Sequence, residues 1–366
     1  MKIEILAMEK SKTVVLLLII LHVHFLKFTI GDNYVDYSDF GNGKSYDGDF
    51  SDVRSTTPPT TTNTVKPISG KLCGSMTNEF CVKRDQCGTH TGKIIIDLTT
   101  PQGVCDYMET CCQQSNINQS RPPHDVNLMH EQCGLTNVDG LYMTVKSSGQ
   151  ETSFAEYPWV VAILDSESKQ ICSGVLISHK VVLSAASCLP PTQNLTVRAG
   201  DWDLLSDSEI VPHENRLVEK IIVHNDLILS QLLNDLALAV LESAFPRTKH
   251  IVPVCMFDDL GSSRLNATSC FAIGWNVIKF TRFFPQKNIV LKIAVDTTTA
   301  LIKKPDGRIE AHNSAHRHLN LMGSPLVCPT EGSQYFLLGI WSYQLQENQT
   351  VFANVTRNLQ WINEHL

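Results

Sequence analysis

The sequence has no excess of positive charge. Its 366 residues include 30 Lys and Arg against 37 Asp and Glu, which gives a formal net charge of −7. A nucleic-acid-binding protein needs a basic surface to neutralise phosphates, so this composition argues against nucleic acid as a partner. The chain is nevertheless 43% hydrophobic. That is enough to bury a full core, and the length allows more than one domain.

Hydrophobic runs of membrane-spanning length are also missing. The one extended apolar run, Val14 to Phe25, follows Lys10 and Lys12 and is shorter than the roughly 20 residues that cross a bilayer. This arrangement predicts a secretory signal peptide over residues 1–31, with Met8 as an alternative start. The competing interpretation is an N-terminal membrane anchor. We expect a soluble, secreted mature protein.

Residues 32–70 lack the apolar residues of a folded core. Aspartates mixed with Tyr and Gly fill the first half, and a run of Ser, Thr and Pro from Ser55 to Thr64 follows. This composition predicts a disordered, extended linker that is open to O-glycosylation. For the acidic part, a docking segment is the alternative to a solvated tail. Proteases favour such exposed chain, which makes Arg54–Ser55 a candidate cleavage site.

Cysteine is plentiful by contrast, and its even count of twelve indicates an oxidising compartment. A unit as small as the one between Cys73 and Cys112 buries too little apolar surface to be stable without disulfide bonds. Cys-x-x-Cys pairs are absent, which argues against zinc. The six cysteines of this unit are Cys73, Cys81, Cys87, Cys105, Cys111 and Cys112.

The spacing of these six, with Cys111 and Cys112 adjacent, resembles the clip domain of arthropod haemolymph proteases. The resemblance implies a clip domain over residues 71–112 and selects one of the fifteen pairings that six cysteines allow. The apolar segment Ile94–Ile96 predicts a central strand of this domain. Its leftover apolar face is a candidate binding groove, with packing inside the domain as the alternative. The implied pairs are Cys73–Cys111, Cys81–Cys105 and Cys87–Cys112.

A second resemblance covers Glu156 to Leu366. The segment from His318 to Cys328 reads HLNLMGSPLVC and resembles the nucleophile loop of trypsin-like serine proteases, Cys-x-Gly-Asp-Ser-Gly-Gly-Pro-Leu-Val-Cys. Short β-branched runs between turn signals independently predict an all-β sandwich or barrel. The resemblance implies a mostly β, chymotrypsin-like domain over residues 151–366, with two six-stranded barrels, after a linker at 113–150. Leu359, Ile362 and Leu366 share one face of an expected C-terminal helix.

The motif positions that carry the chemistry in this family are altered here. Met322 stands for the nucleophilic serine, and Ser187 for the histidine of Thr-Ala-Ala-His-Cys, whereas Asp235 matches the orienting aspartate. A thioether cannot attack a carbonyl, and a serine hydroxyl cannot shuttle a proton near neutral pH. The resemblance therefore implies triad-equivalent positions without catalysis. Asp235 is expected to accept hydrogen bonds from Ser187, Ser342 or backbone N–H groups in place of an imidazole.

The positions that would face a substrate depart from the family as well. Gln344 stands for a glycine and should crowd the specificity pocket, whose floor position is His316. Leu321 replaces the aspartate that pairs with the new amino terminus after activation, and Asn320 replaces the first glycine of the motif. Between Cys133 and Glu156 the cleavable Arg or Lys followed by Ile-Val-Gly-Gly is missing.

The remaining cysteines pair without remainder under the family pattern, which leaves no thiol nucleophile. A cluster of His312, His316 and His318 is a candidate metal site, but its irregular spacing is more typical of solvated loops, so no metal or cofactor is expected. Sequons mark candidate glycosylation sites in a secreted chain. The pairs are Cys133–Cys255, Cys172–Cys188 and Cys270–Cys328. The sequons begin at Asn118, Asn194, Asn266, Asn348 and Asn354.

Together these features predict a secreted, non-catalytic clip-domain serine protease homologue. The resemblance implies an adaptor role in extracellular proteolytic cascades, such as prophenoloxidase activation in melanisation and innate immunity. The expected partners are cascade serine proteases, prophenoloxidase or a similar substrate. Two alternatives remain, an active trypsin-like endopeptidase and an adhesive matrix protein. Cofactors of this family are often cut, and Lys93–Ile94 is a second candidate cleavage site.

Overall fold

The structure is a computed structural model, and it describes most of the chain after residue 70. The expected signal peptide and linker, residues 1–70, lie outside the described residues. The clip region, which we define as residues 71–112, belongs with the remaining chain to one compact unit, Lys66–Leu366. The described residues are 71–74, 78–88, 93–100, 103–118, 132–190, 194–257, 269–277, 287–296, 306–315, 318–331 and 334–366.

The clip region is built on a two-stranded antiparallel sheet of β1 (Glu79–Lys83) and β3 (Glu109–Gln113). Each strand runs into a single 3-10 turn, η1 (Arg84–Gln86) or η2 (Gln114–Asn116). Three disulfides cross this small sheet and supply the constraint that its few apolar side chains cannot. They are Cys73–Cys111, Cys81–Cys105 and Cys87–Cys112, the pairs that the resemblance implies.

Strand β2 (Ile94–Asp97) is not the central strand of the clip region, so that prediction is wrong. It pairs in parallel with β4 (Met143–Lys146), from Ile94 opposite Met143 to Asp97 opposite Lys146. Ile96 is fully buried in the main apolar core, while Ile95 is 66% exposed. The apolar character of this segment therefore reflects packing against a distant part of the chain rather than an open groove.

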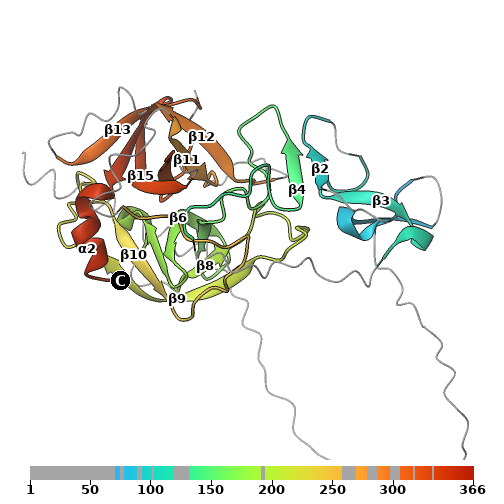
Figure 1. The fold of residues 1–366 in the computed structure, drawn as a ribbon, viewed down its shortest axis with the longest axis horizontal. Coiled ribbons are helices and arrows are strands. Elements are labelled where there is room, and N and C mark those ends of the chain that lie inside the picture. Colours follow the sequence, from blue (N-terminus) through green and yellow to red (C-terminus); the bar gives the residue numbers. More distant parts are fainter. Residues whose placement is uncertain are drawn as a thin grey trace, which may run out of the picture. The chain divides into compact units, whose positions relative to one another are not determined.

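The rest of the chain forms two closed six-stranded barrels followed by a short helix, which confirms the expected fold (Figure 1). Alternating side chains of β12 point into its barrel, as the period of two requires. Closure gives every strand of each barrel a neighbour on both sides. The first barrel comprises β5 (Val160–Leu164), β6 (Gln170–Ser178), β7 (Val181–Ser184), β8 (Thr196–Ala199), β9 (Glu214–Val223) and β10 (Ala237–Leu241). The second comprises β11 (Phe271–Gly274), β12 (Leu291–Asp296), β13 (Arg308–Asn313), β14 (Pro325–Pro329), β15 (Tyr335–Gln346) and β16 (Gln349–Asn354).

The C-terminal helix α2 (Leu359–Asn363) follows the 3-10 turn η6 (Thr356–Asn358). Ile362 is fully buried and Leu359 packs against the core, but Leu366 is 59% exposed because the helix ends before it. The expected helical face is therefore shorter than the sequence pattern suggested. No helix in the described part of the chain combines the length and apolar character needed to cross a membrane.

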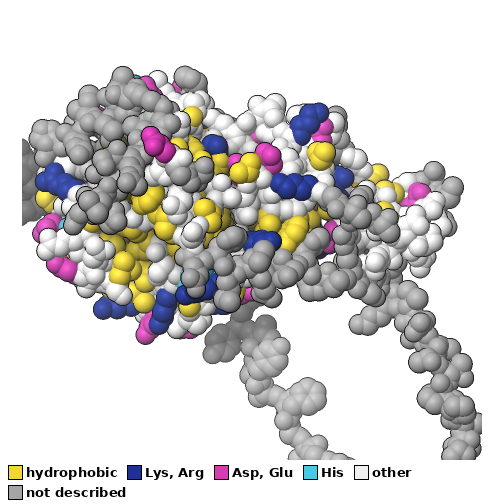
Figure 2. Space-filling model, viewed as in Figure 1, with side chains coloured by type: hydrophobic (Ala, Val, Ile, Leu, Met, Phe, Trp, Pro, Cys, Tyr) yellow, Lys and Arg dark blue, Asp and Glu magenta, His cyan; other side chains and the backbone are white. Residues whose placement is uncertain are grey.

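Three further disulfides hold the barrels, and all twelve cysteines are paired. One joins β6 to the 3-10 turn η3 (Ala186–Cys188), and another ties the incoming linker to the chain between the barrels. On the face seen in Figure 2, Lys and Arg are interspersed with Asp and Glu. The bonds are Cys133–Cys255, Cys172–Cys188 and Cys270–Cys328, again those that the resemblance implies.

The clip region shares its apolar core with the first barrel. Ile96, Tyr107 and Met108 belong to the same cluster of buried side chains as Phe154 and Trp202. Polar contacts accompany this packing. The Tyr107 hydroxyl donates to the buried Asp203 carboxylate. Lys83 Nζ donates to the backbone oxygens of residues 207 and 209, at 3.1 and 3.0 Å. The shared apolar cluster and these hydrogen bonds together fix the clip region to the barrel.

An unusual acid lies beneath this contact. The Glu209 side chain is only 3% exposed, and its carboxyl accepts the Asp203 N–H at 3.2 Å. Burial, together with the nearby charge of Asp201, raises the pKa of Glu209 to about 8. Desolvation penalises the charged form of a carboxyl, so Glu209 is protonated in the folded protein at neutral pH.

This burial predicts a pH-dependent stability. Because the folded-state pKa of Glu209 exceeds its ordinary value of 4.5, its contribution is complete below that value and is lost as pH rises through about 8. The melting temperature should therefore fall from mildly acidic to mildly alkaline pH, and Glu209→Gln should flatten this fall. Thermal unfolding followed by near-UV circular dichroism measures it. Glu219→Gln, at a side chain that is 59% exposed, is the matched control. Parallel curves for wild type and Glu209→Gln would refute the assignment.

Candidate functional site

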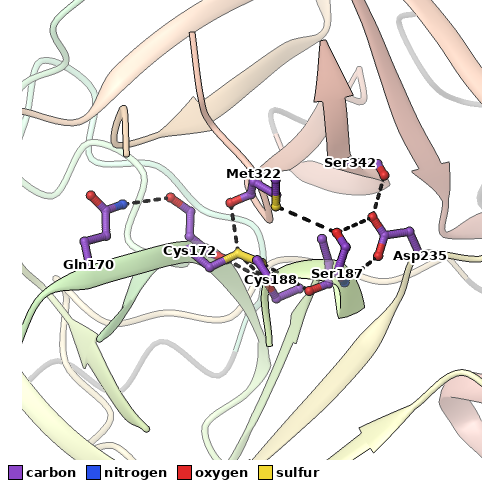
Figure 3. Close-up of a disulfide and its surroundings, with 10 residues drawn as sticks. Gln170, Cys172, Ser187, Cys188, Asp235, Met322 and Ser342 are labelled. Carbon is purple, nitrogen blue, oxygen red and sulfur yellow. Dashed lines mark hydrogen bonds between the residues drawn. A yellow bond between two sulfur atoms is a disulfide. The ribbon is translucent and has the colours of Figure 1, made fainter. Parts of the chain in front are cut away.

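Three side chains that the motifs predict to act together do meet in space. Ser187 lies in the turn after β7, Asp235 just before β10, and Met322 in the turn before β14 (Figure 3). The Ser187 hydroxyl donates to the Asp235 carboxylate at 2.8 Å and lies 3.7 Å from the Met322 sulfur. The first barrel contributes the first two residues, and the second barrel contributes the third.

Asp235 is fully buried, and hydroxyls and a backbone N–H satisfy its carboxylate. The Ser187 N–H donates to one carboxylate oxygen at 2.7 Å, and the hydroxyls of Ser187 and Ser342 donate to the other. This confirms the expectation that these groups take the place of an imidazole. Three donors therefore hold the buried Asp235 carboxyl in place, and both of its oxygens have partners.

Met322 fills the position that faces this carboxylate network. Its side chain is half-buried and packs against the apolar clusters of both the first barrel and the main core. Its sulfur is a weak acceptor for the Ser187 hydroxyl. The partners of the Ser187 hydroxyl are thus a carboxylate and a thioether rather than an imidazole. The arrangement therefore holds these three side chains together through hydrogen bonds and packing.

The loop that carries Met322 is locked by packing rather than by charge. Leu321 is fully buried among the apolar side chains of the second barrel. Gly323 has φ +82°, and a Cβ there would lie 2.1 Å from the backbone oxygen of Ser173. Only glycine fits such a close approach at positive φ. The Ser173 N–H in turn donates to the Met322 oxygen at 2.9 Å, which ties the loop to β6.

The structure adds Asn276 to the site, a residue that no motif marked. The backbone N–H of Asn320 donates to the side-chain oxygen of Asn276 at 2.8 Å, and the Val277 N–H donates to the Asn320 oxygen at 2.8 Å. A donor of the Met322 loop is thus occupied by the chain itself. The local sequence gives no signal for this, since Asn276 lies in the segment after β11, far from residue 320 in sequence.

Gln344 links strand β15 to the same loop. Its side-chain oxygen accepts the Leu319 N–H at 2.8 Å, and its amide nitrogen donates to the Glu347 oxygen at 2.7 Å. A third link comes from Arg308, another residue that the motifs missed. Its guanidinium donates to the Gln231 oxygen at 3.2 Å and to the Tyr343 hydroxyl at 2.8 Å. Side chains therefore tie together several segments around Asp235 and Met322.

The histidine cluster gains no support as a metal site. His316 lies outside the described residues, and His312 and His318 are exposed. Among the described residues, only Cys73, Cys81 and Cys105 bring three candidate ligand atoms close together. These three sulfurs are all in disulfides, which removes them as ligands because a metal needs the thiolate.

The sequons differ in accessibility. Asn118 and Asn194 are exposed and Asn348 is half-buried, so these remain predictions, whereas Asn266 lies outside the described residues. Asn354 is 6% exposed, and its side-chain oxygen accepts from the Thr356 hydroxyl and the Arg357 N–H. A glycan on Asn354 does not fit this buried arrangement, since its local hydrogen bonds would have to break.

The clip region contains a cavity of about 360 Å³. Its wall carries charge of both signs from Arg84, Asp106 and Glu109, and includes the Cys73–Cys111 disulfide. The Arg84 guanidinium is held in position by the Tyr107 oxygen, to which it donates at 3.1 and 3.2 Å. A hollow of this size with charged side chains in its wall is a candidate site for part of a peptide chain.

Comparison with known proteins identifies the architecture. The trypsin family model matches residues 146–362. Inactive CLIP domain-containing serine protease A8 of Anopheles gambiae is 29% identical over 308 residues, covering 76% of this chain and 84% of that protein. Inactive CLIP domain-containing serine protease A28 of the same species is 26% identical over 338 residues, 82% of this chain and 88% of its own. Phenoloxidase-activating factor 2 of Galleria mellonella is 29% identical over 279 residues, 66% and 91% respectively.

The matches to the two Anopheles gambiae relatives cover 76% and 82% of this chain, which is more than the two barrels alone. The family match covers both barrels and begins at Lys146, and the clip region carries its own three disulfides. The fold, the disulfide-rich N-terminal region and the named relatives agree. The chain therefore belongs to the trypsin family, as a clip-domain serine protease homologue.

Proposed function

We propose that this protein is a secreted, catalytically inactive adaptor in an extracellular proteolytic cascade, of the kind that activates prophenoloxidase in melanisation. The observation that carries the proposal is the filled network at Asp235, in which Ser187 stands for the catalytic histidine and Met322 for the nucleophilic serine. Two relatives named inactive and one named phenoloxidase-activating factor support the same role. Twelve paired cysteines are in keeping with secretion.

The absence of chemistry follows from the two replaced residues. In the Ser-His-Asp triad, histidine takes the serine proton and later returns it to the leaving amine. Ser187 cannot do so near neutral pH, and Met322 has no proton to lose. Asp235 alone orients a base and does not perform the bond chemistry. Its retention is explained by the hydroxyls that it holds in place.

The geometry around the loop opposes catalysis a second time. Protease action needs loop N–H groups that point at the developing oxyanion, but the Asn320 N–H is already bonded to Asn276. The Gln344 side chain reaches from β15 to the Leu319 N–H, where a substrate side chain would have to enter. An active endopeptidase is therefore disfavoured by this site as well as by the triad positions.

The clip region and its cavity favour a binding role. The clip region is fixed to the first barrel through Tyr107 and Lys83, and its cavity is rimmed by Arg84, Asp106 and Glu109. We propose that this composite surface holds a cascade serine protease, prophenoloxidase or a similar protein. A tether to extracellular matrix is the alternative that uses the same surface.

Affinity capture from haemolymph tests the role. Immobilised full-length protein should retain immune serine proteases or phenoloxidase, and Glu109→Lys at the clip cavity should reduce the amount retained. Glu167→Lys, an equal charge change in an exposed turn of the first barrel, is the control and should bind like wild type. Recovery of matrix components alone, insensitive to Glu109→Lys, would support the tether and overturn the cascade role.

The first prediction for the site is the absence of labelling. Purified protein, before or after treatment with a trypsin-like activator, should hydrolyse no peptide amide and should form no adduct with fluorophosphonate reagents, because Met322 stands at the nucleophile position and the Ser187 hydroxyl is bonded to a carboxylate rather than to an imidazole. Intact-mass spectrometry measures the adduct, with trypsin as the positive control. A stoichiometric adduct on any serine of residues 151–366 would contradict the pseudoenzyme proposal.

A second prediction is that restoring the triad does not restore activity. Ser187→His combined with Met322→Ser rebuilds the nucleophile and base beside Asp235, yet the Asn320 N–H stays occupied by Asn276. The loss of one oxyanion donor alone costs about a hundredfold or more in rate. Buried Leu321 also offers no carboxylate to a new amino terminus. Turnover of Lys and Arg amides should remain near background.

The control for this experiment is the same double variant with Met322→Ala in place of Met322→Ser. Turnover by the repaired protein that this control abolishes would show that the oxyanion site is already formed. Adding Asn276→Gly to the repaired protein separates the two obstacles, because it frees the Asn320 N–H while Leu321 stays in place.

A further inference from the structure

The bond between Lys146 and Ser147 has the composition of a site for a trypsin-like endopeptidase. Such enzymes select a basic side chain on the residue before the cleaved bond, and the Lys146 side chain is 67% exposed. A polar bend follows at once, in which the Ser147 hydroxyl donates to Glu151 at 2.6 Å and accepts the Gly149 N–H at 2.9 Å. The backbone around this bond, however, is already hydrogen-bonded to another strand and is not available to a protease.

Strand β2 of the clip region occupies the backbone edge that a protease would need. An endopeptidase binds its substrate as an added extended strand through main-chain hydrogen bonds. Here the Ile94 N–H donates to the Tyr142 oxygen at 2.8 Å, and the Leu98 N–H donates to the Lys146 oxygen at 2.9 Å. Alternate residues of a strand face the same edge. Thr144, between these two acceptors, therefore faces β2 as well.

The carbonyl of the bond itself is among the occupied groups. The Lys146 oxygen is the atom that must move into an oxyanion site during hydrolysis, and it accepts the Leu98 N–H. The Lys146 ammonium also lies 3.2 Å from the Asp97 carboxylate, although an exposed pair of this kind adds little. On the opposite edge, the Val145 N–H donates to the Ser153 hydroxyl at 3.0 Å. Both edges of β4 are thus engaged within the chain.

Strand β2 is kept in place beside β4 by the burial of its Ile96 side chain. Ile96, in the middle of β2, is fully buried in the main core beside Tyr107 and Phe154. The hydroxyl of Tyr107 donates to Asp203 of the first barrel. β2 therefore leaves β4 only when this part of the clip region leaves the barrel. Proteolysis of a native protein proceeds through such local openings.

We propose that Lys146–Ser147 is a latent processing site for a trypsin-like endopeptidase, and that clip strand β2 masks it until the clip region is displaced. Hydrolysis breaks the amide bond, with water supplying a hydroxyl to the Lys146 carboxyl and a proton to the new Ser147 amine. The proposal concerns control of the chain by another enzyme, and it stands or falls independently of the adaptor role.

Limited digestion of the full-length protein with trypsin tests the masking. The rate at which chains with an N-terminal Ser147 form is followed by mass spectrometry under reducing conditions. Leu98→Pro removes the N–H that binds the Lys146 oxygen, and Leu98→Ala is the matched control that keeps it. We expect slow cleavage in wild type and Leu98→Ala, and about tenfold faster cleavage in Leu98→Pro, as for the loss of one backbone hydrogen bond. Lys146→Gln should abolish the Ser147 terminus.

Tyr107→Phe provides a second route if Leu98→Pro does not fold, as judged by near-UV circular dichroism and an intact disulfide mass. This change removes the hydroxyl that donates to Asp203 but leaves the hydrogen bonds between β2 and β4 intact. It should also accelerate formation of the Ser147 terminus. If Leu98→Pro and Tyr107→Phe both fold and form the Ser147 terminus at the wild-type rate, the proposed masking is overturned. Cleavage of other Lys and Arg bonds with no Ser147 terminus in any variant would overturn the site itself.

Discussion

The buried carboxylate of Asp235 is the constraint on which the centre of this molecule depends. A charge removed from water must be compensated, or it costs several kcal/mol. Here the compensation comes from the Ser187 hydroxyl and N–H and from the Ser342 hydroxyl. Because these donors come from both barrels, the acid fastens one barrel to the other. These hydrogen bonds leave neither oxygen of the Asp235 carboxyl without a partner.

The surroundings of this acid are closed by the chain's own side chains. Asn276 binds a backbone donor of the Met322 loop, Gln344 binds another, and Arg308 joins β13 to β15 and to the Gln231 oxygen. Buried polar groups in proteins need partners. Where a substrate would satisfy them in an enzyme, this chain satisfies them internally. The family fold is thereby kept, with internal partners for these groups.

Sequence reasoning succeeded where the signal is local or carried by a motif. β-branched runs marked the barrel strands, and motif order placed Ser187, Asp235 and Met322 together. It failed where contacts join distant segments without periodicity. Asn276 gives no local sign of its bond to residue 320, and Ile94–Ile96 shows only that a strand is apolar, not which strand it joins. The raised pKa of Glu209 likewise depends on burial that the sequence Ser-Asp-Ser-Glu does not reveal.

Leu321 makes it energetically unfavourable for this loop to carry the acid of the family motif. A carboxylate introduced at this fully buried position would face apolar neighbours before any amino terminus existed to pair with it. An inserted activation sequence would likewise deliver an amine to a pocket without an acid. Each single step back is destabilising until the other has occurred. The apolar side chain at residue 321 therefore makes each change unfavourable alone, so an acid and an amino terminus to pair with it would have to arise together.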